Sequence, residues 1–128
     1  MSGILFLCIH NAGRSQMAAG FARELSGGDV LILSGGSDPA DSVNPIAVDV
    51  MNEVGIDIST YVPQKYNDDL LNAVDVVVTM GCGDTCPYIP GKRYVDWPLD
   101  DPKGKPLEDV RRIRDEIKDH VTELLAQL

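Results

Sequence analysis

The sequence predicts an α/β fold in which a four-stranded parallel sheet carries helices on both faces. Short apolar runs without alternation recur along the chain, as expected for strands buried on both faces. Between them lie segments whose apolar residues are spaced by one and four, which is typical of one face of a helix. Strands that alternate with helices favour a doubly wound parallel sheet.

Each expected element rests on one of these local signals. The strongest strand signal is the β-branched run Val74 to Thr79, and the strongest helix signal is the apolar spacing that follows Leu107. Glycine or proline marks most element ends, as at Gly27-Gly28 and Pro45. In chain order we expect a strand at 3–7, a helix at 15–25, a strand at 30–33 closed by 34–36, a helix at 45–54, a short helix at 67–73, a strand at 74–79, a short strand at 94–97 and a helix at 107–128.

Length and composition exclude several classes of protein. A chain of 128 residues predicts one domain, residues 1–128. The formal net charge of −9 argues against nucleic acid and anionic membranes as partners. Neither a membrane-spanning run nor a secretory signal is present, so we expect a cytoplasmic protein, by default a monomer. Three cysteines favour reduced, reactive thiols over a disulfide framework.

The expected topology gathers the reactive side chains at one edge of the sheet. Four strands suggest the flavodoxin-like order with the first strand central, and ligands of such sheets bind beyond the carboxyl ends of the strands. The loop after the first strand carries Cys8 and Arg14. The loops after the third and fourth strands carry Cys82 with Cys86, and Asp101.

The loop after the first strand has the composition of an anion site beside a thiol. Cys8 ends the apolar run, Arg14 follows after five intervening residues, and a helix starts near Ser15. A helix N-terminus and a cation both favour the thiolate, and arginine offers a two-pronged donor to an oxyanion. Asn11 and Gly13 tolerate the left-handed backbone angles that such a loop requires. We therefore predict an oxyanion-binding loop made of Cys8, Ile9, His10, Asn11, Ala12, Gly13, Arg14 and Ser15.

Blander interpretations remain for each residue. Cys8 could be an inert buried thiol, and His10 a partly exposed histidine without a catalytic task. Ser15 could either donate to the thiolate or cap the helix. Cys82 and Cys86 could be unrelated thiols, a disulfide pair, or part of a zinc site.

Taken together, these residues resemble the arsenate reductase branch of the low-molecular-weight tyrosine phosphatase family. The resemblance covers nearly the whole chain. It is carried by the loop from Cys8 to Ser15 and by the following segments: Ser34-Gly35-Gly36, Asn44-Pro45, Val54 to Ser59, Asp75 to Thr79, Cys82-Gly83-Asp84, Trp97 to Pro102 and Arg112 to Ile117.

The resemblance implies a reaction in which three thiols act in sequence. Cys8 would attack arsenate, Cys82 would then attack Cys8 and release arsenite, and Cys86 would move the disulfide to the Cys82–Cys86 pair, which thioredoxin reduces. Asp101, which precedes Pro102, would act as the general acid. Phosphate and sulfate would compete for the loop, and no cofactor or metal is expected.

Departures from the family pattern leave alternatives open. Gly13 stands where many relatives have a second loop cysteine, and Lys103 follows where phosphatases commonly have tyrosines. Ala19 and Gln64 occupy the positions of acidic residues that hold potassium in some reductases, so we predict no potassium site. A tyrosine phosphatase, a reductase that uses mycothiol or another small thiol, and an oxyanion-binding or redox-sensing module are the alternative functions. Asp100 competes with Asp101 for the acid role.

Overall fold

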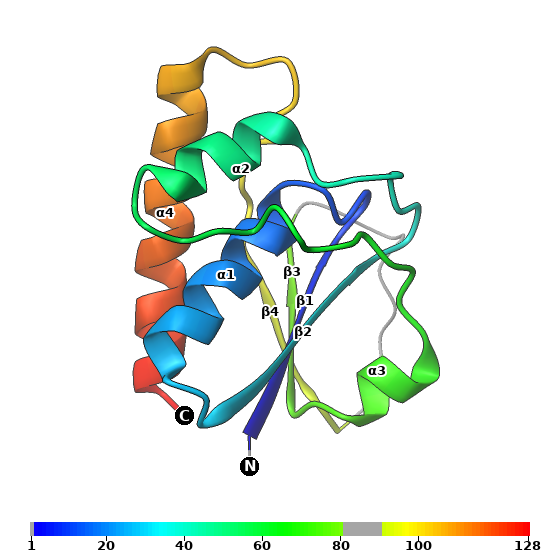
Figure 1. Cartoon of the computed structure of the whole chain (residues 1–128). Coiled ribbons are helices and arrows are strands. Elements are labelled where there is room, and N and C mark those ends of the chain that lie inside the picture. Colours follow the sequence, from blue (N-terminus) through cyan, green and yellow to red (C-terminus); the bar gives the residue numbers. More distant parts are fainter. Residues whose placement is uncertain (1, 81–90) are drawn as a thin grey trace.

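A computed structural model of the chain, which describes residues 2–80 and 91–128, contains a four-stranded parallel sheet (Figure 1). The strand order is β2-β1-β3-β4, so the first strand is central, as predicted. Their bounds are β1 (Ser2–Cys8), β2 (Val30–Gly36), β3 (Val76–Thr79) and β4 (Arg93–Asp96).

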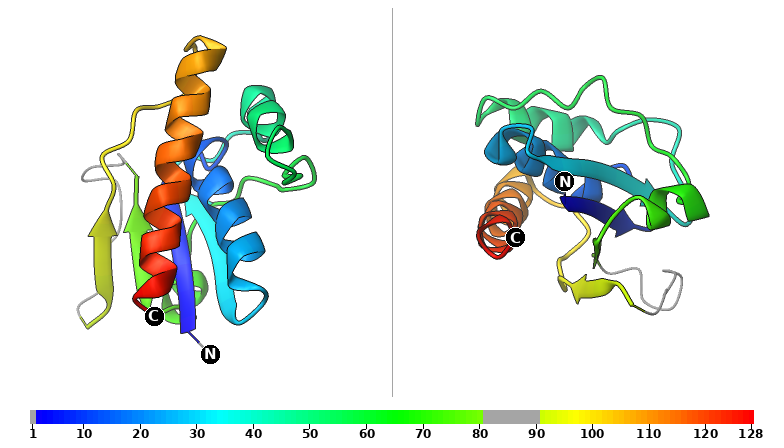
Figure 2. Two further views of the ribbon diagram at one scale, coloured as in Figure 1. Left: turned by 90° about the vertical axis from the view of Figure 1, so that its left-hand side faces the viewer. Right: turned by 90° about the horizontal axis from the view of Figure 1, so that it is seen from below.

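Helices cover both faces of this sheet, which confirms the predicted fold class (Figure 2). On one face lie α1 (Arg14–Ser26), α2 (Pro45–Asn52) and α4 (Leu107–Ala126). The short helix α3 (Asp68–Asn72) lies on the other face, where its Leu71 packs in one cluster with Leu5 and Leu7. Asn67 caps α3, since its Oδ1 accepts a hydrogen bond from the backbone N–H of Leu70 at 2.8 Å.

The central strand explains why the core is divided in two. Successive side chains of a strand point to opposite faces, so Ile4 and Phe6 join the larger cluster beneath α1, α2 and α4. Leu5 and Leu7 face the smaller cluster. Because β1 is buried on both sides, its sequence is an unbroken apolar run. Cys8 is the last residue of this buried strand, so its backbone is held in place by the sheet.

The second strand is longer than predicted, because Ser34-Gly35-Gly36 extends it instead of closing it. Gly36 pairs with Cys8, and its amide donates to the carbonyl of Gln64 at 2.9 Å. A Cβ on Gly36 would lie 2.5 Å from the carbonyl oxygen of Ile9. Glycine here is therefore not a strand breaker: it gives the cysteine loop room to lie against the end of β2.

The remaining differences concern element ends. Helix α2 ends at Asn52, two residues before Val54, and β3 begins at Val76, two residues after Val74. Gly27 ends α1 in the left-handed conformation (φ 64°), as the sequence indicated. Among residues 2–80 and 91–128, no helix combines the length and apolar character that crossing a membrane requires.

Candidate oxyanion and thiol site

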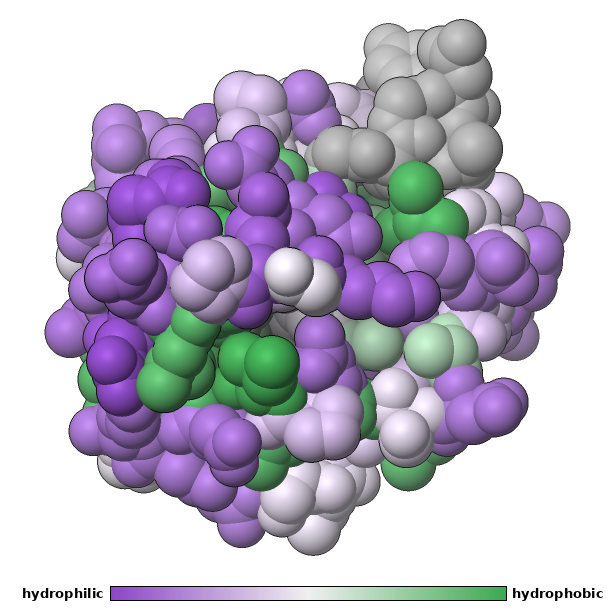
Figure 3. Space-filling model, turned by 90° about the horizontal axis from the view of Figure 1, so that it is seen from above, coloured by the Kyte–Doolittle hydropathy of each residue, from purple (hydrophilic) through white to green (hydrophobic). Residues whose placement is uncertain are grey.

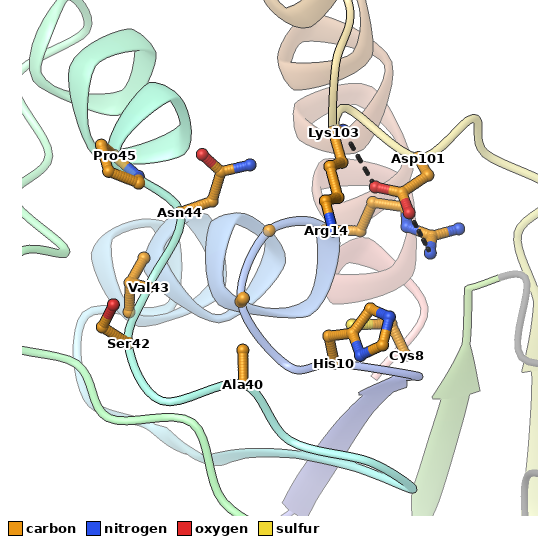
Figure 4. A pocket seen from close by; sticks show the side chains of 12 residues that line it. Cys8, His10, Arg14, Ala40, Ser42, Val43, Asn44, Pro45, Asp101 and Lys103 are labelled. Atoms are coloured by element: carbon orange, nitrogen blue, oxygen red, sulfur yellow. Dashed lines mark hydrogen bonds and ion pairs between the residues drawn. The ribbon is translucent and has the colours of Figure 1, made fainter.

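The loop from Cys8 to Ser15 joins the carboxyl end of β1 to the N-terminus of α1 (Figure 4). Cys8 is the last residue of the strand and is 3% exposed. Helix α1 begins at Arg14, so its unpaired N–H groups and the positive end of its dipole face the loop. The sheet therefore fixes the thiol, and the helix supplies a favourable field for negative charge.

Two hydrogen bonds converge on the sulfur of Cys8. The backbone N–H of Asn11 donates to Sγ at 3.2 Å, and Ser15 Oγ lies 2.9 Å from Sγ. The Asn11 side-chain amide donates to Ser15 Oγ at 2.7 Å, which fills an acceptor position of that hydroxyl. The Ser15 hydroxyl can then direct its own proton at the sulfur. A sulfur atom that accepts two donors is stabilised as the thiolate, the nucleophilic form.

Asn11 is the centre of the buried polar network behind the thiol. Its φ of 49° is left-handed, as predicted, and its side chain is fully buried. Its Oδ1 accepts from the backbone N–H of Gln64 at 3.0 Å and from Gln16 Nε2 at 3.3 Å. Gln16 Nε2 also donates to the Asn11 carbonyl at 3.0 Å, and Ser34 Oγ donates to Gln16 Oε1 at 3.3 Å. Within the described residues, every fully buried side-chain nitrogen or oxygen has a partner.

Arg14 connects the thiol loop to the loop after β4. Its side chain is buried, and Nη1 donates to the carbonyl of Leu99 at 3.1 Å. Nη2 lies 3.9 Å from Asp101 Oδ2. A guanidinium has five N–H donors, so the bond to Leu99 fixes the plane of the group and leaves donors for an anion.

The two neighbouring aspartates of the loop after β4 point to different partners. Asp101 lines the same cavity as Cys8 and Arg14, and its Oδ1 accepts from the backbone N–H of Lys103 at 3.0 Å. Asp100 instead lies 3.7 Å from Arg112 of α4. Between the two competing acids, Asp101 is therefore the one that borders the cavity.

The cavity above the thiol has a volume of about 300 Å³ and opens at the carboxyl ends of the strands. Figure 3 views this face, on which hydrophobic side chains form small separate groups among hydrophilic ones. The wall of the cavity opposite Asp101 comes from the loop before α2 (Figure 4). The lining residues are Cys8, His10, Ala12, Gly13, Arg14, Ala40, Ser42, Val43, Asn44, Pro45, Asp101 and Lys103.

One expectation for this loop is corrected, and one pair of alternatives is resolved. Gly13 has a φ of −127°, so it does not adopt the predicted left-handed conformation. Its missing side chain matters for space: a Cβ there would lie 3.1 Å from Cγ of Pro102. Ser15 does not cap α1, whose N-cap position is Gly13; its hydroxyl is used at the sulfur instead.

Several supporting residues were missed by the sequence analysis. Gln16, Ser34 and Gln64 hold Asn11 or one another through hydrogen bonds, and Asn44 and Lys103 border the cavity. A polar Gln16 in the first turn of an otherwise apolar helix face was a visible signal for a buried partner. The role of the Gln64 backbone had no local signal, since it depends on a contact 53 residues away along the chain.

The positions that hold potassium in some reductases do not fit a cation in this chain. Ala19 is fully buried and offers no side-chain oxygen. Gln64 Nε2 donates to the carbonyl of Ser34 at 2.8 Å, so a hydrogen-bond donor is turned toward that oxygen. In the part of the chain that the structure describes, no group of three or more His, Cys, Asp or Glu side chains is arranged to hold a metal. Cys82 and Cys86 lie outside the described residues.

Comparison with known proteins places this geometry in a family. Residues 3–85 match the model of the low molecular weight phosphotyrosine protein phosphatases. Arsenate reductase 2 of Staphylococcus haemolyticus is 43% identical over 119 residues, which cover 90% of this chain and 89% of that protein. The glutaredoxin arsenate reductase of Synechocystis is 37% identical over 131 residues, covering 100% and 99%.

A solved structure agrees with both relatives. The thioredoxin-dependent arsenate reductase of Corynebacterium glutamicum superimposes with a TM-score of 0.87 and 39% identity over 99% of this chain. The chain spans 61% of the length of that solved protein. The family match, the two relatives and the superposition agree, and the chain belongs to the low molecular weight phosphotyrosine protein phosphatase family.

Proposed function

We propose that this protein reduces arsenate to arsenite through a thiol relay that begins at Cys8. The observation that carries the proposal is the double hydrogen bond to Cys8 Sγ, from the Asn11 amide and the Ser15 hydroxyl. It prepares a thiolate in the same cavity as Arg14, which can bind the oxyanion. The relatives named arsenate reductases support this choice of oxyanion.

The first step joins sulfur to arsenic. The Cys8 thiolate attacks the arsenic of arsenate held by the loop amides and Arg14, and a new S–As bond replaces an As–O bond. Asp101 gives its proton to the departing oxygen, which leaves as water. The Asp101 side chain borders the cavity and is about half exposed, so it can exchange its proton with solvent between turnovers.

The second and third steps are thiol–disulfide exchanges. The Cys82 thiolate attacks Cys8 Sγ; the S–As electron pair passes to arsenic, which leaves as arsenite, and a Cys8–Cys82 disulfide remains. Cys86 then attacks Cys82, which frees Cys8 and produces a Cys82–Cys86 disulfide. A dithiol protein supplies two electrons to reduce that disulfide. The absence of a loop cysteine at Gly13 leaves Cys82 and Cys86 as the candidate partners for Cys8.

Thioredoxin is the electron donor that we propose. The two additional cysteines favour a protein dithiol over a small thiol such as mycothiol, which would attack the Cys8 adduct directly. The names of the relatives point to both thioredoxin and glutaredoxin, so the donor is tested by substitution of one for the other. We expect arsenate to drive rapid NADPH oxidation with thioredoxin and its reductase. With glutaredoxin and glutathione in their place, the rate of arsenate-dependent NADPH oxidation should be low.

Mapping of the thiols after a single turnover tests the relay. One equivalent of arsenate added to the reduced protein should yield one arsenite and a Cys82–Cys86 disulfide, found by mass spectrometry of alkylated peptides. Cys86→Ser should release one arsenite, retain a Cys8–Cys82 disulfide and then stop. Steady turnover of Cys86→Ser with thioredoxin would exclude the relay. Cys8→Ser is the matched control and should release no arsenite.

A further inference from the structure

His10 occupies a position in the loop that none of the proposed steps uses. Its side chain is exposed and borders the same cavity as Cys8 and Arg14 (Figure 4). Nδ1 lies 2.9 Å from the backbone carbonyl oxygen of Asp38. A carbonyl oxygen only accepts hydrogen bonds, so Nδ1 carries a proton, and the neutral ring keeps its lone pair on Nε2. The ring can therefore gain a proton at Nε2 without losing its bond to Asp38.

The charges around the cavity make the state of His10 important. Before an anion binds, with Cys8 as the thiolate and Asp101 ionised, the negative charges of these two lining residues balance the positive charges of Arg14 and Lys103. The whole chain carries a formal charge of −9, which repels a dianion at long range. A proton on His10 would change the balance at the cavity from neutral to positive.

We propose that His10 is an anion-binding residue that acts in its protonated form, so that oxyanions bind this loop more tightly as the pH falls through the range in which histidine gains its proton. The inference rests on the proposed function, because it takes the loop as the oxyanion site. It adds a dependence on pH that the relay itself does not require. The charged groups near His10 are Arg14 on α1, Asp101 and Lys103 after β4, and the exposed Asp38 and Asp41 of the loop before α2.

Sulfate is the appropriate probe, because it stays a dianion across the range of interest while arsenate itself changes protonation near neutrality. The protein should carry Cys8→Ser, which removes the ionisable thiol. Arginine and lysine keep their charges between about pH 5.5 and pH 8. The same protein also carries Asp101→Asn, because the proposed reaction needs that carboxyl to be protonated, so histidine is the side chain near the cavity that changes charge. The dissociation constant of sulfate is measured by calorimetry at both ends of that range and at constant ionic strength.

Two substitutions at His10 give opposite expectations. In the Cys8→Ser protein, sulfate binding should tighten about three- to tenfold from pH 8 to pH 5.5, the size expected for one added charge near a solvated dianion. His10→Gln can still donate a hydrogen bond to the Asp38 carbonyl but cannot be charged, so its binding should be weak and unchanged with pH. His10→Lys should bind tightly at both pH values. His120→Gln, at the other histidine of the chain, should keep the full pH dependence.

The outcomes separate this inference from the proposed function. If His10→Gln keeps the pH dependence, or if the Cys8→Ser protein shows none while binding sulfate, the role of His10 is excluded and the relay is untouched. If no variant binds sulfate at either pH, both the role of His10 and the oxyanion loop are excluded. Tight, pH-independent binding by His10→Lys, together with the flat response of His10→Gln, supports the inference.

Discussion

The two loops that meet over the cavity are built in different ways. The thiol loop is buried: Asn11, Ser15 and Gln16 are all at most 1% exposed and are joined by hydrogen bonds. The loop after β4 is open, and the Asp101 side chain is 51% exposed. Arg14 joins the second loop to the first through one hydrogen bond to the Leu99 carbonyl and a longer ion pair to Asp101.

This difference matches the tasks that we propose for the two loops. A nucleophile and its anion-binding donors gain from a fixed geometry, because donors that are already aimed need no rearrangement during the reaction. A general acid must lose its proton and recover it from solvent, for which exposure is useful. The two loops should therefore respond differently to substitution. Changes in the buried loop should lower both stability and thiol reactivity, whereas changes in the exposed loop should lower turnover alone.

Asp101→Asn should give the largest effect on activity. The amide cannot supply a proton to the leaving oxygen, and loss of a general acid costs about 10²- to 10⁴-fold in kcat. The residue is half exposed, so the free energy of unfolding should change by less than about 0.5 kcal/mol. Steady-state kinetics and urea unfolding of the same sample measure both quantities.

Asp100→Asn is the matched control for that substitution. It removes the same charge one residue earlier, from a side chain that lies near Arg112 rather than at the cavity. Its kcat should stay close to that of the unaltered protein. Equal losses in the two variants would show that charge at the loop, and not a proton from Asp101, accounts for the effect.

The thiol loop was predictable from sequence because its signals are local. Cys8 follows an unbroken apolar run, and Arg14 precedes a helix face, so strand, loop and helix could be placed from neighbouring residues. The extension of β2 through Gly36 was not predictable in this way, because glycine usually weakens a strand. Its reason is the Ile9 carbonyl, which approaches from a different part of the chain.

The part of the site that depends on tertiary contacts was predicted less well. Asp101 was preferred over Asp100 mainly on the family pattern, and the contacts that separate their side chains come from Arg14 and Arg112 on two different helices. Gly13 was assigned a left-handed backbone from its residue type alone. Its φ of −127° shows that space beside Pro102, which no local pattern reveals, is the requirement at that position.

Asn11→Gly should give the second-largest effect, a decrease in both stability and thiol reactivity. Glycine keeps the left-handed backbone at φ 49° without strain, so the variant removes only the side-chain hydrogen bonds with Ser15, Gln16 and Gln64. Buried groups left without partners should lower the free energy of unfolding by roughly 2 to 3 kcal/mol. The freed Ser15 hydroxyl no longer needs to point at the sulfur, so alkylation of Cys8 by iodoacetamide should slow at neutral pH.

Ser26→Gly provides a comparison for that variant, because it removes a half-buried serine at the far end of α1, where the hydroxyl donates to the Arg23 carbonyl. The alkylation rate of Cys8 should remain unchanged in Ser26→Gly. If Asn11→Gly alkylates at the rate of the unaltered protein, the side-chain network does not stabilise the thiolate, and the contrast between the two loops would be one of stability alone.

Glu53→Gln should give the smallest effect and leave both loops unchanged. Glu53 joins the end of α2 to α4, where it accepts from Arg111 Nη2 at 2.7 Å and from Arg114 Nη1 at 2.8 Å. The hydrogen bond from Arg111, followed by that from Arg114, lowers the pKa of the Glu53 carboxyl below its usual value.

This pKa shift makes the contribution of Glu53 to stability depend on pH. A carboxylate whose pKa is lower in the folded state adds stability above its pKa in the unfolded chain, and that stability is lost as the pH falls through its pKa in the folded protein. The Tm of Glu53→Gln should therefore lie below that of the unaltered protein at neutral pH, and the difference should shrink as the pH falls below about 4.3, the ordinary pKa of glutamate. Glu116→Gln, which breaks an exposed pair within α4, should shift Tm less, and kcat should be unchanged in both variants. A loss of turnover in Glu53→Gln would mean that the α2–α4 contact, and not only the two loops, sets the geometry at Cys8.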